Sequence, residues 1–467
     1  MPKSKPVASG VSYNYASQDF IPIACHYDAS TLLTKNGELS QTIQIRGTFS
    51  QTIGDDLAHL RDIIRSTIQK NVISDNFAFW IHTVRRKTNL DDSSPYPDPL
   101  SSTIHKVWRD KNYWHDKFVN TLYITIVHAR SDMKISTPQA FIQSLFTSKI
   151  EKSHDEFVQG AAAKLHSVVD SILGDLGSFG ATKLGLQELN GMYYSEPLSL
   201  YSRIMNLNEH QVLLPIKDLS EALSTNHYAV GNNQIEVIDG AQKKFSAIIS
   251  IKEYHEMSED ALDRILRLSV EFIATEIFYF IPKKLATAEL TYYDYILGIS
   301  KEQNLRDCTN ISTIMSIPEN APNKFCNQQI SIAFIGDNIE HLTANLVNAS
   351  KEFSALGIVH VQEDINLEQT FWSQLPGNFT FLRRTAPNTV DNTAAFASLH
   401  NFPTGNSTNP WGKAITLLRT KQGTPHFVNF HNESGAGNMV VFGPTQSGKT
   451  VAMNFLLSEA MKFKPSI

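Results

Sequence analysis

The residues Gly443-Pro444-Thr445-Gln446-Ser447-Gly448-Lys449-Thr450 decide the fold of the last part of the chain. They match the phosphate-binding pattern G-x-x-x-x-G-K-[ST] at every fixed position. The apolar run 439–442 predicts a buried strand before the loop, and the spacing of apolar residues in 451–462 predicts a helix after it. Strand, glycine loop and helix form the arrangement that cradles the phosphates of a nucleotide.

The predicted site is the loop together with the first helical residues. We expect ATP to contact Gly443, Pro444, Thr445, Gln446, Ser447, Gly448, Lys449, Thr450 and Val451. The ammonium of Lys449 would reach the β- and γ-phosphates, and the hydroxyl of Thr450 would ligate Mg²⁺. These two are the predicted catalytic residues. The competing interpretation is an ordinary glycine turn before a helix.

The loop lies close to Ile467, the last residue of the chain. A phosphate-loop ATPase domain needs a parallel sheet of several strands, and an acidic residue on a second strand to hold Mg²⁺. No such residue follows the loop here. The sequence therefore predicts the front portion of a longer protein, cut inside its nucleotide-binding domain and inactive as an ATPase in this form.

Composition narrows the class of protein. The 467 residues leave room for two or three domains, and 42% hydrophobic with 19% charged residues is typical of a globular protein. With a net charge of −5, the protein has no overall positive potential that would attract nucleic acid. Its three widely spaced cysteines argue against a framework of disulfide bonds. No apolar run reaches the roughly 18 residues that span a bilayer. We expect a cytoplasmic protein, or one that is held at a membrane by its partners.

The order of predicted elements divides the chain into five parts. The first is an α/β subdomain over 1–134, where Asn36-Gly37 marks a hairpin turn. Its remaining elements are a helix over 55–69, a strand over 77–84, a helix over 103–119 and a strand over 122–128. A mainly helical insertion follows over 135–224. Its helices are predicted at 157–173 and at 196–206, the latter capped by Ser195.

The third part, 225–365, repeats the element order of the first without a repeat of residues. It begins with a hairpin turn at Asp239-Gly240, and a capping box of Asp337 and Glu340 opens its last helix. Its other elements are strands at 277–281, 330–335 and 358–362 and helices at 258–274 and 285–305. A connecting region, 366–425, leads to the start of the phosphate-loop domain, 426–467. The predicted fold class is α/β: an α+β N-terminal domain with mixed sheets, followed by the start of a RecA-like domain.

Four ordered segments carry a family resemblance. They are 371–378 (F-W-S-Q-L-P-G-N), 409–412 (N-P-W-G), 423–431 (G-x-P-x-x-x-N-x-H) and the loop 443–450. Together with the hairpin of 31–37 they resemble the CagE/TrbE/VirB ATPases of type IV secretion and conjugation machines. The departure from the family pattern is the missing remainder of the ATPase domain.

The resemblance implies an ATPase at the cytoplasmic face of a bacterial inner membrane, which powers pilus assembly or substrate translocation. It implies membrane components of the machine and other secretion ATPases as partners, and a homo-oligomer, either a hexamer or dimers of one. A protein or DNA substrate is also implied. The alternative is a non-catalytic docking scaffold that anchors the motor to the membrane components.

Individual residues in these segments have competing interpretations. Trp372 and Trp411 are expected to pack between domains and not to touch a ligand. His431 is expected to be a buried, hydrogen-bonded histidine rather than a catalytic one. The strand that contains it would pair with the strand before the phosphate loop. Arg383 and Arg384 are expected to be a surface pair rather than an arginine finger.

Overall fold

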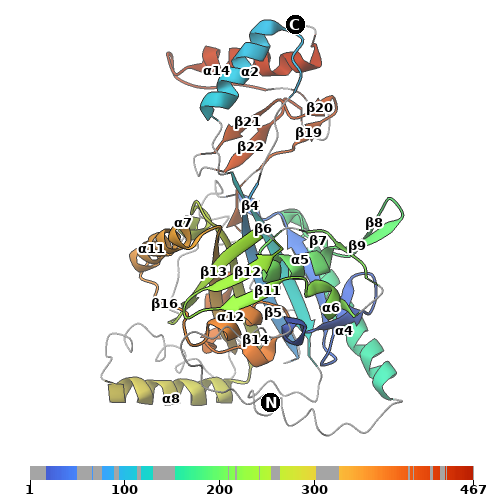
Figure 1. Ribbon diagram of the computed structural model, residues 1–467, viewed down its shortest axis with the longest axis vertical. Coiled ribbons are helices and arrows are strands. Elements are labelled where there is room, and N and C mark those ends of the chain that lie inside the picture. Colours follow the sequence, from blue (N-terminus) through green and yellow to red (C-terminus); the bar gives the residue numbers. More distant parts are fainter. Residues whose placement is uncertain are drawn as a thin grey trace. The chain divides into compact units, whose positions relative to one another are not determined.

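Figure 1 shows the computed structural model, which divides into two compact units. Unit 1 consists of Met1–Val84 and Thr121–His400, and unit 2 consists of Arg85–Asn120 and Asn401–Ile467. The structure describes residues 17–49, 66, 76–88, 94–112, 117–129, 153–208, 210–215, 218–240, 242–253, 263–300, 325–397, 400–402, 404–420, 424–431, 437 and 439–465. The predicted helix over 55–69 lies outside these residues, apart from Ser66, which is helical.

Unit 1 is built around a 13-stranded sheet, in which every pairing with a described register is antiparallel. Ten strands form a continuous path in the order β1-β2-β3-β6-β5-β14-β15-β13-β12-β11, and three short strands pair beside it. The path strands are β1 (Ile23–His26), β2 (Thr31–Thr34), β3 (Leu39–Ile45), β5 (Phe77–Lys87), β6 (Phe118–His128), β11 (His227–Val230), β12 (Ile235–Asp239), β13 (Gln242–Ile251), β14 (Glu271–Ile281) and β15 (Phe325–Gly336). The side strands are β7 (Thr182–Lys183), β16 (His360–Gln362) and β17 (Ala386–Thr389).

The strand order reads the same from both ends of the sheet. The sequence β1-β2-β3-β6-β5 is matched by β11-β12-β13-β15-β14, and the two halves meet at β5 and β14. Helix α4 (Ser153–Asp175) leads to β7, which pairs with β3, just as α11 (Ile339–Ala355) leads to β16, which pairs with β13. The predicted repeat is therefore confirmed for the hairpins and strands. Of the helices in the predicted order, the one over 258–274 is contradicted, and the one over 55–69 lies outside the described residues apart from Ser66.

Helices cover both faces of the sheet. On one face, α4 places Leu165, Val169 and Ile172 at helical spacing against strands β3, β5 and β6. The other face is covered by α5 (Glu196–Asn206), α6 (Leu219–Leu223) and α12 (Leu367–Ser373). Helix α8 (Lys283–Ser300) packs through Ala286 and Leu290 on a third apolar cluster. Further helices among the described residues of unit 1 are η1 (Ser17–Phe20), η2 (Gly177–Phe179), α7 (Asp263–Leu266), η3 (Phe379–Phe381) and α13 (Val390–Phe396).

Turn and cap residues predicted several elements correctly. Asp239 pairs with Gln242 across a two-residue turn in which Gly240 takes a φ of 56°. Helix α5 has its predicted bounds, and the Ser195 hydroxyl accepts a hydrogen bond from the Leu198 N–H at 3.2 Å. The first hairpin also forms, but its turn is longer than two residues, because the Thr34 N–H donates to the carbonyl oxygen of Glu38.

Other predicted elements were wrong. The helix over 258–274 is contradicted, since α7 is one short turn and β14 already begins at Glu271. Both faces of β14 are buried, so its apolar residues run together and do not alternate as in a half-buried strand. The helix over 103–119 is α2 (Pro99–Asn112), which starts earlier and ends before β6. The cap of α11 is Asn338, whose Oδ1 accepts from the His341 N–H at 2.8 Å, and not Asp337.

The segment predicted as mainly helical also contains a three-stranded antiparallel sheet. Its order is β10-β9-β8, and Asn190 and Gly191 form the turn between β8 and β9 with left-handed φ values of 55° and 77°. The strands are β8 (Leu186–Leu189), β9 (Met192–Ser195) and β10 (Val212–Leu213). The Asn-Gly pair is the sequence signal that the prediction did not use.

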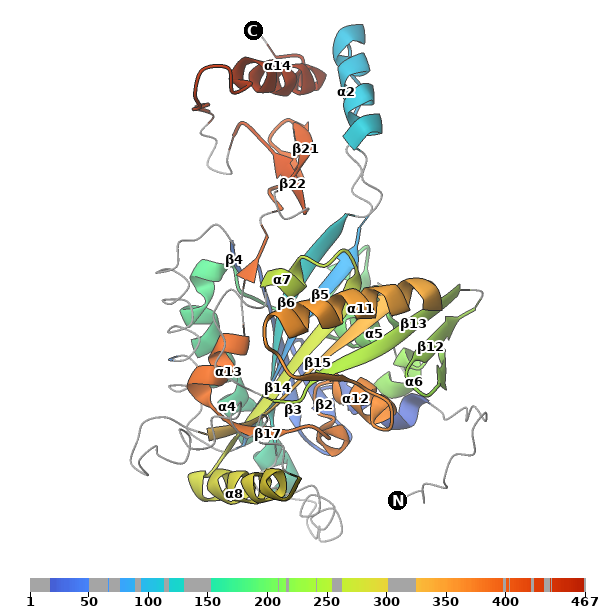
Figure 2. The same cartoon turned by 90° about the vertical axis from the view of Figure 1, so that its left-hand side faces the viewer.

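Unit 2 contains α2, two short hairpins and the last helices of the chain (Figure 2). Its C-terminal elements are β19 (Thr408–Asn409), β20 (Gly412–Lys413), β21 (Thr416–Arg419), β22 (Pro425–Val428), α14 (Lys449–Ala460) and η4 (Met461–Phe463). Two further short strands lie outside this set, since β4 (Thr48–Phe49) belongs to unit 1 and β18 (His400–Asn401) spans the point in the sequence where unit 1 ends and unit 2 resumes. Helix α14 packs beside α2, although the two are more than 300 residues apart in the sequence.

Two predictions about unit 2 were wrong. Residues 439–442 form no strand, and Phe442 is 89% exposed. Strand β22 does not pair with this segment but with β21, where Leu417 is opposite Phe427. A strand needs a neighbouring strand to pair with and a buried face. Residues 439–442 have neither among the described residues 404–420, 424–431 and 439–465. The α+β part of the predicted fold class is confirmed, but the described strand pairings are antiparallel and not mixed, and the start of a RecA-like sheet is not shown.

Candidate functional site

The predicted phosphate loop forms a turn that runs directly into α14. Gln446 and Gly448 both take left-handed backbone conformations, with φ values of 64° and 86°. Gly448 caps the helix through its backbone, and its carbonyl oxygen accepts from the Ala452 N–H at 3.0 Å. The left-handed φ explains the need for glycine at this position, since a side chain here is strained. The loop thus curls in front of a helix N-terminus, as an anion-binding loop must.

Lys449 is folded back over the loop. Its Nζ donates to the carbonyl oxygens of Gly443 at 2.7 Å and of Pro444 at 2.5 Å. A Cβ at position 443 would lie 2.7 Å from Oγ of Ser447, so the exposed serine side chain would have to rotate away. The ammonium therefore lies above the loop, where it can exchange carbonyl contacts for phosphate oxygens.

The remaining predicted site residues are open to solvent. Pro444, Thr445, Gln446, Ser447, Thr450 and Val451 are all exposed. The first N–H groups of α14 have no partner within the helix, and the helix dipole adds partial positive charge there. Backbone N–H groups, one ammonium and one hydroxyl fit the chemistry of a magnesium–triphosphate group.

Among residues 439–465, the described segment that contains the loop, no carboxylate lies beside Thr450 to assist it in holding Mg²⁺. Glu459 is the acidic residue within 439–465. It lies ten residues after Lys449, about 15 Å further along the helix axis. Its carboxylate is fully buried and contacts His105 instead. Sequence analysis did not single out this pair, because 354 residues separate its members.

The two tryptophans of the family segments differ in their surroundings. Trp372 is 3% exposed and stacks on Phe20 within unit 1, with ring centroids 4.8 Å apart. It therefore belongs to the core of one unit, which contradicts packing between domains. Trp411 is 57% exposed, and its ring lies 4.3 Å from that of His431. His431 is half-buried and contacts this indole edge to face.

Segment 371–378 is fixed by hydrogen bonds to its backbone. Trp80 Nε1 donates to the Ser373 carbonyl at 3.0 Å, and the Tyr201 hydroxyl donates to the Pro376 carbonyl at 3.0 Å. His82 Nε2 lies 2.9 Å from the Gln374 carbonyl oxygen. Burial lowers the pKa of His82 to about 4, so the neutral ring donates this bond. The segment has a structural role in the core of unit 1.

Arg384 is not free to act as an arginine finger. Its guanidinium contacts both carboxylate oxygens of Glu363, which is completely buried. Arg383 donates to the carbonyl oxygens of Thr380 and Leu382. Arg383 is exposed, as expected for a surface residue, whereas Arg384 is half-buried in its ion pair, so the predicted surface pair is confirmed for Arg383 only.

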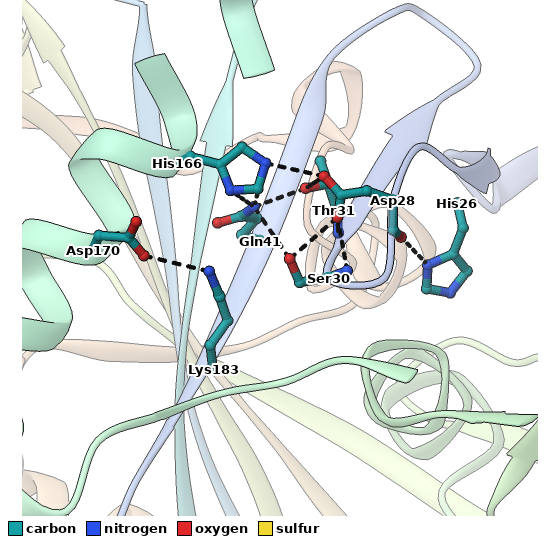
Figure 3. Close-up of polar contacts among 8 residues, drawn as sticks. All are labelled: His26, Asp28, Ser30, Thr31, Gln41, His166, Asp170 and Lys183. Atoms are coloured by element: carbon teal, nitrogen blue, oxygen red, sulfur yellow. Dashed lines mark hydrogen bonds and ion pairs between the residues drawn. The ribbon is translucent and has the colours of Figure 1, made fainter. Parts of the chain in front are cut away.

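A second group of polar side chains lies around Asp28 in unit 1 (Figure 3). The carboxylate accepts from the Ser30 and Thr31 N–H groups at 2.8 Å and from His166 Nε2 at 3.0 Å. Although burial favours the neutral acid, these bonds hold the pKa of Asp28 at about 2. Gln41 Nε2 lies 3.0 Å from His166 Nδ1. Because these groups bind one another, they fasten α4 to the turn before β2.

Two kinds of feature are absent from the part of the chain that is described. No group of three or more histidine, cysteine, aspartate or glutamate side chains is arranged there to hold a metal ion. None of the helices described there combines the length and the apolar composition that a bilayer crossing needs.

Two families match the chain. Residues 182–384 match the CagE, TrbE, VirB family, described as a component of the type IV transporter system. Residues 30–134 match the N-terminal domain of the type IV secretion system ATPase VirB4/TrbE. Both matches lie outside the phosphate loop.

Curated relatives cover nearly the whole chain. The type IV secretion system protein virB4 of Bartonella henselae is 26% identical over 459 residues, which is 96% of this chain and 57% of that protein. The virB4 protein of Brucella melitensis is 25% identical over 95% of this chain and 55% of its own length. The PtlC homolog of Bordetella bronchiseptica is 24% identical over 95% and 55%. The chain spans about half the length of the curated relatives it matches.

Proposed function

Because this chain belongs to the CagE/TrbE/VirB family of type IV transporter components, we propose that it carries the nucleotide-binding loop of a secretion ATPase. ATP would bind with its phosphates at Gly443–Val451. Lys449 would contact the β- and γ-phosphates, and Thr450 would ligate Mg²⁺. The observation that carries the proposal is the left-handed Gly448 at the start of α14, with Lys449 folded over the loop.

The test is nucleotide binding by the full chain. We expect a fluorescent ATP analogue to bind in the presence of Mg²⁺, and Lys449→Ala to weaken binding by at least tenfold. Lys351→Ala, an exposed lysine on α11, is the matched control and should bind like the wild type. Equal binding by the wild type and Lys449→Ala would reject the site.

We also propose that ATP turnover powers pilus assembly or substrate translocation at the cytoplasmic face of the inner membrane. The support is the identity of the relatives, which are named as type IV secretion system proteins. The partners would be membrane components of that system, other secretion ATPases and further copies of the chain, in a hexamer or dimers of one. The substrate would be a protein or DNA.

The alternative function is a docking scaffold. It is favoured by one observation, namely that both family matches lie in residues 30–134 and 182–384 and not in the loop. Complementation of a secretion mutant separates the two functions. A motor predicts that Lys449→Ala loses transport while the protein still co-purifies with the membrane components. A scaffold predicts that the same variant restores transport.

A further inference from the structure

The two repeats of unit 1 use their connecting helices differently. Helix α8 connects β14 with β15 and packs on the core of unit 1. Helix α2 is its counterpart, since it connects the neighbouring strands β5 and β6, yet it belongs to unit 2. There it packs on α14, the helix that the proposed phosphate loop precedes (Figures 1 and 2).

The contact between α2 and α14 has an aromatic part and a polar part. Trp108 and Phe455 form the aromatic part, with ring centroids 4.5 Å apart. In the polar part, the Glu459 carboxylate accepts from His105 Nδ1 at 2.9 Å and from the Tyr96 hydroxyl at 3.0 Å. On each helix the two residues are three or four positions apart, so each pair lies on one face.

Glu459 depends on these two donors. Its side chain is fully buried, and His105 is only 8% exposed. Oε1 of Glu459 and Nε2 of His105 have no hydrogen-bond partner within the described part of the chain. A buried carboxylate without hydrogen-bond partners strongly destabilises the folded state. Because the partners of Glu459 come from α2 and the loop before it, these contacts hold α14 in position against α2.

We propose that Tyr96, His105 and Glu459 are positioning residues for nucleotide binding, a role that rests on the proposed function of the loop. Glu459 lies about 15 Å along α14 from Lys449, and Tyr96 and His105 contact Glu459, so all three are assigned a role away from the nucleotide itself. Their effect is to fix the axis of α14 against α2, so that the first turn of α14 presents its N–H groups, Lys449 and Thr450 in one orientation. A preformed loop binds more tightly than one that must be ordered on binding.

The test compares variants of the full chain in the ATP-analogue binding assay, well below their melting temperatures. His105→Leu removes the imidazole donor and should raise Kd about tenfold, the effect of one hydrogen bond to a charged group. His105→Asn keeps an N–H donor near the position of Nδ1 and should restore Kd to within about twofold of the wild type. Lys106→Ala, on the exposed side of α2, is the control and should change nothing.

Tyr96→Phe is the second variant, because His105→Leu could fail to fold. It removes one of two donors and should raise Kd about threefold. The positioning role would be overturned if His105→Leu and Tyr96→Phe left Kd unchanged while Lys449→Ala lost binding. That result would leave the assignment of the loop as the nucleotide site intact. If His105→Leu does not fold, Tyr96→Phe alone decides in the same way. Unchanged binding in Lys449→Ala would instead reject the proposed function itself.

Discussion

Nε2 of His166, on α4, lies 3.0 Å from Oδ2 of Asp28, in the turn between β1 and β2. The two residues are 138 positions apart, and their contact joins the helix on one face of the sheet to its edge. Asp28 also accepts two backbone N–H bonds and the Thr31 hydroxyl. The carboxylate is therefore the centre of the turn, and its ionised form is the one that the fold stabilises.

Asp28→Asn should lower the free energy of unfolding at pH 7 by about 1–2 kcal/mol, because an amide cannot replace all of these acceptor contacts. The folded-state pKa of Asp28, about 2, is below its ordinary value of 3.8. This contribution is therefore present above about pH 4 and is lost as the pH falls through 2. Urea unfolding at pH 7 and pH 3 measures both effects. Asp170→Asn, which breaks an exposed ion pair with Lys183, should cost less than about 0.5 kcal/mol.

Glu276 should make the stability fall with rising pH. Burial raises its pKa from 4.5 to about 8, although Gln328 Nε2 donates to Oε1 at 2.6 Å. The folded state then holds its proton at higher pH than the unfolded state, so stability decreases between about pH 4.5 and 8. Glu276→Gln should remove this slope and melt at a higher temperature than the wild type at pH 8. An equal slope in both proteins would show that another group is responsible.

Tyr201→Phe should destabilise unit 1 by about 1–2 kcal/mol, since the Pro376 carbonyl would lose a buried donor. Tyr292→Phe is the matched control, because Tyr292 is 67% exposed on α8 and should change stability by less than about 0.5 kcal/mol. Thermal unfolding of both variants gives the comparison. Equal melting temperatures for the two would mean that the hydroxyl of Tyr201 contributes nothing.

Two glycine substitutions should act in opposite directions. Gly160 lies on the exposed side of α4 with open space around it, so Gly160→Ala should stabilise the protein by about 0.5–1 kcal/mol. Gly448 has open space too, but its φ of 86° strains any side chain. Gly448→Ala should therefore distort the loop and weaken binding of the ATP analogue, while Gly160→Ala leaves binding unchanged. A loop that binds equally well with alanine at 448 would argue against the left-handed turn.

Local signals predicted the parts of the fold in which neighbouring residues decide the conformation. Asp239-Gly240 determined a turn and Ser195 determined a helix start, because turns and caps depend on a few adjacent backbone groups. The boundary at Glu271 could not be predicted in this way, because burial on both faces of β14 removes the alternation that distinguishes a strand. The phosphate loop was found from its pattern alone, whereas Tyr96 and His105 meet Glu459 only through the tertiary fold.

The symmetric strand order of unit 1 gives its two linking helices different surroundings. Helix α8 of the second half packs on the core that both halves share, so a substitution in α8 acts on unit 1 itself. Helix α2 of the first half belongs to unit 2, so a substitution there acts on the C-terminal region and leaves the shared core intact.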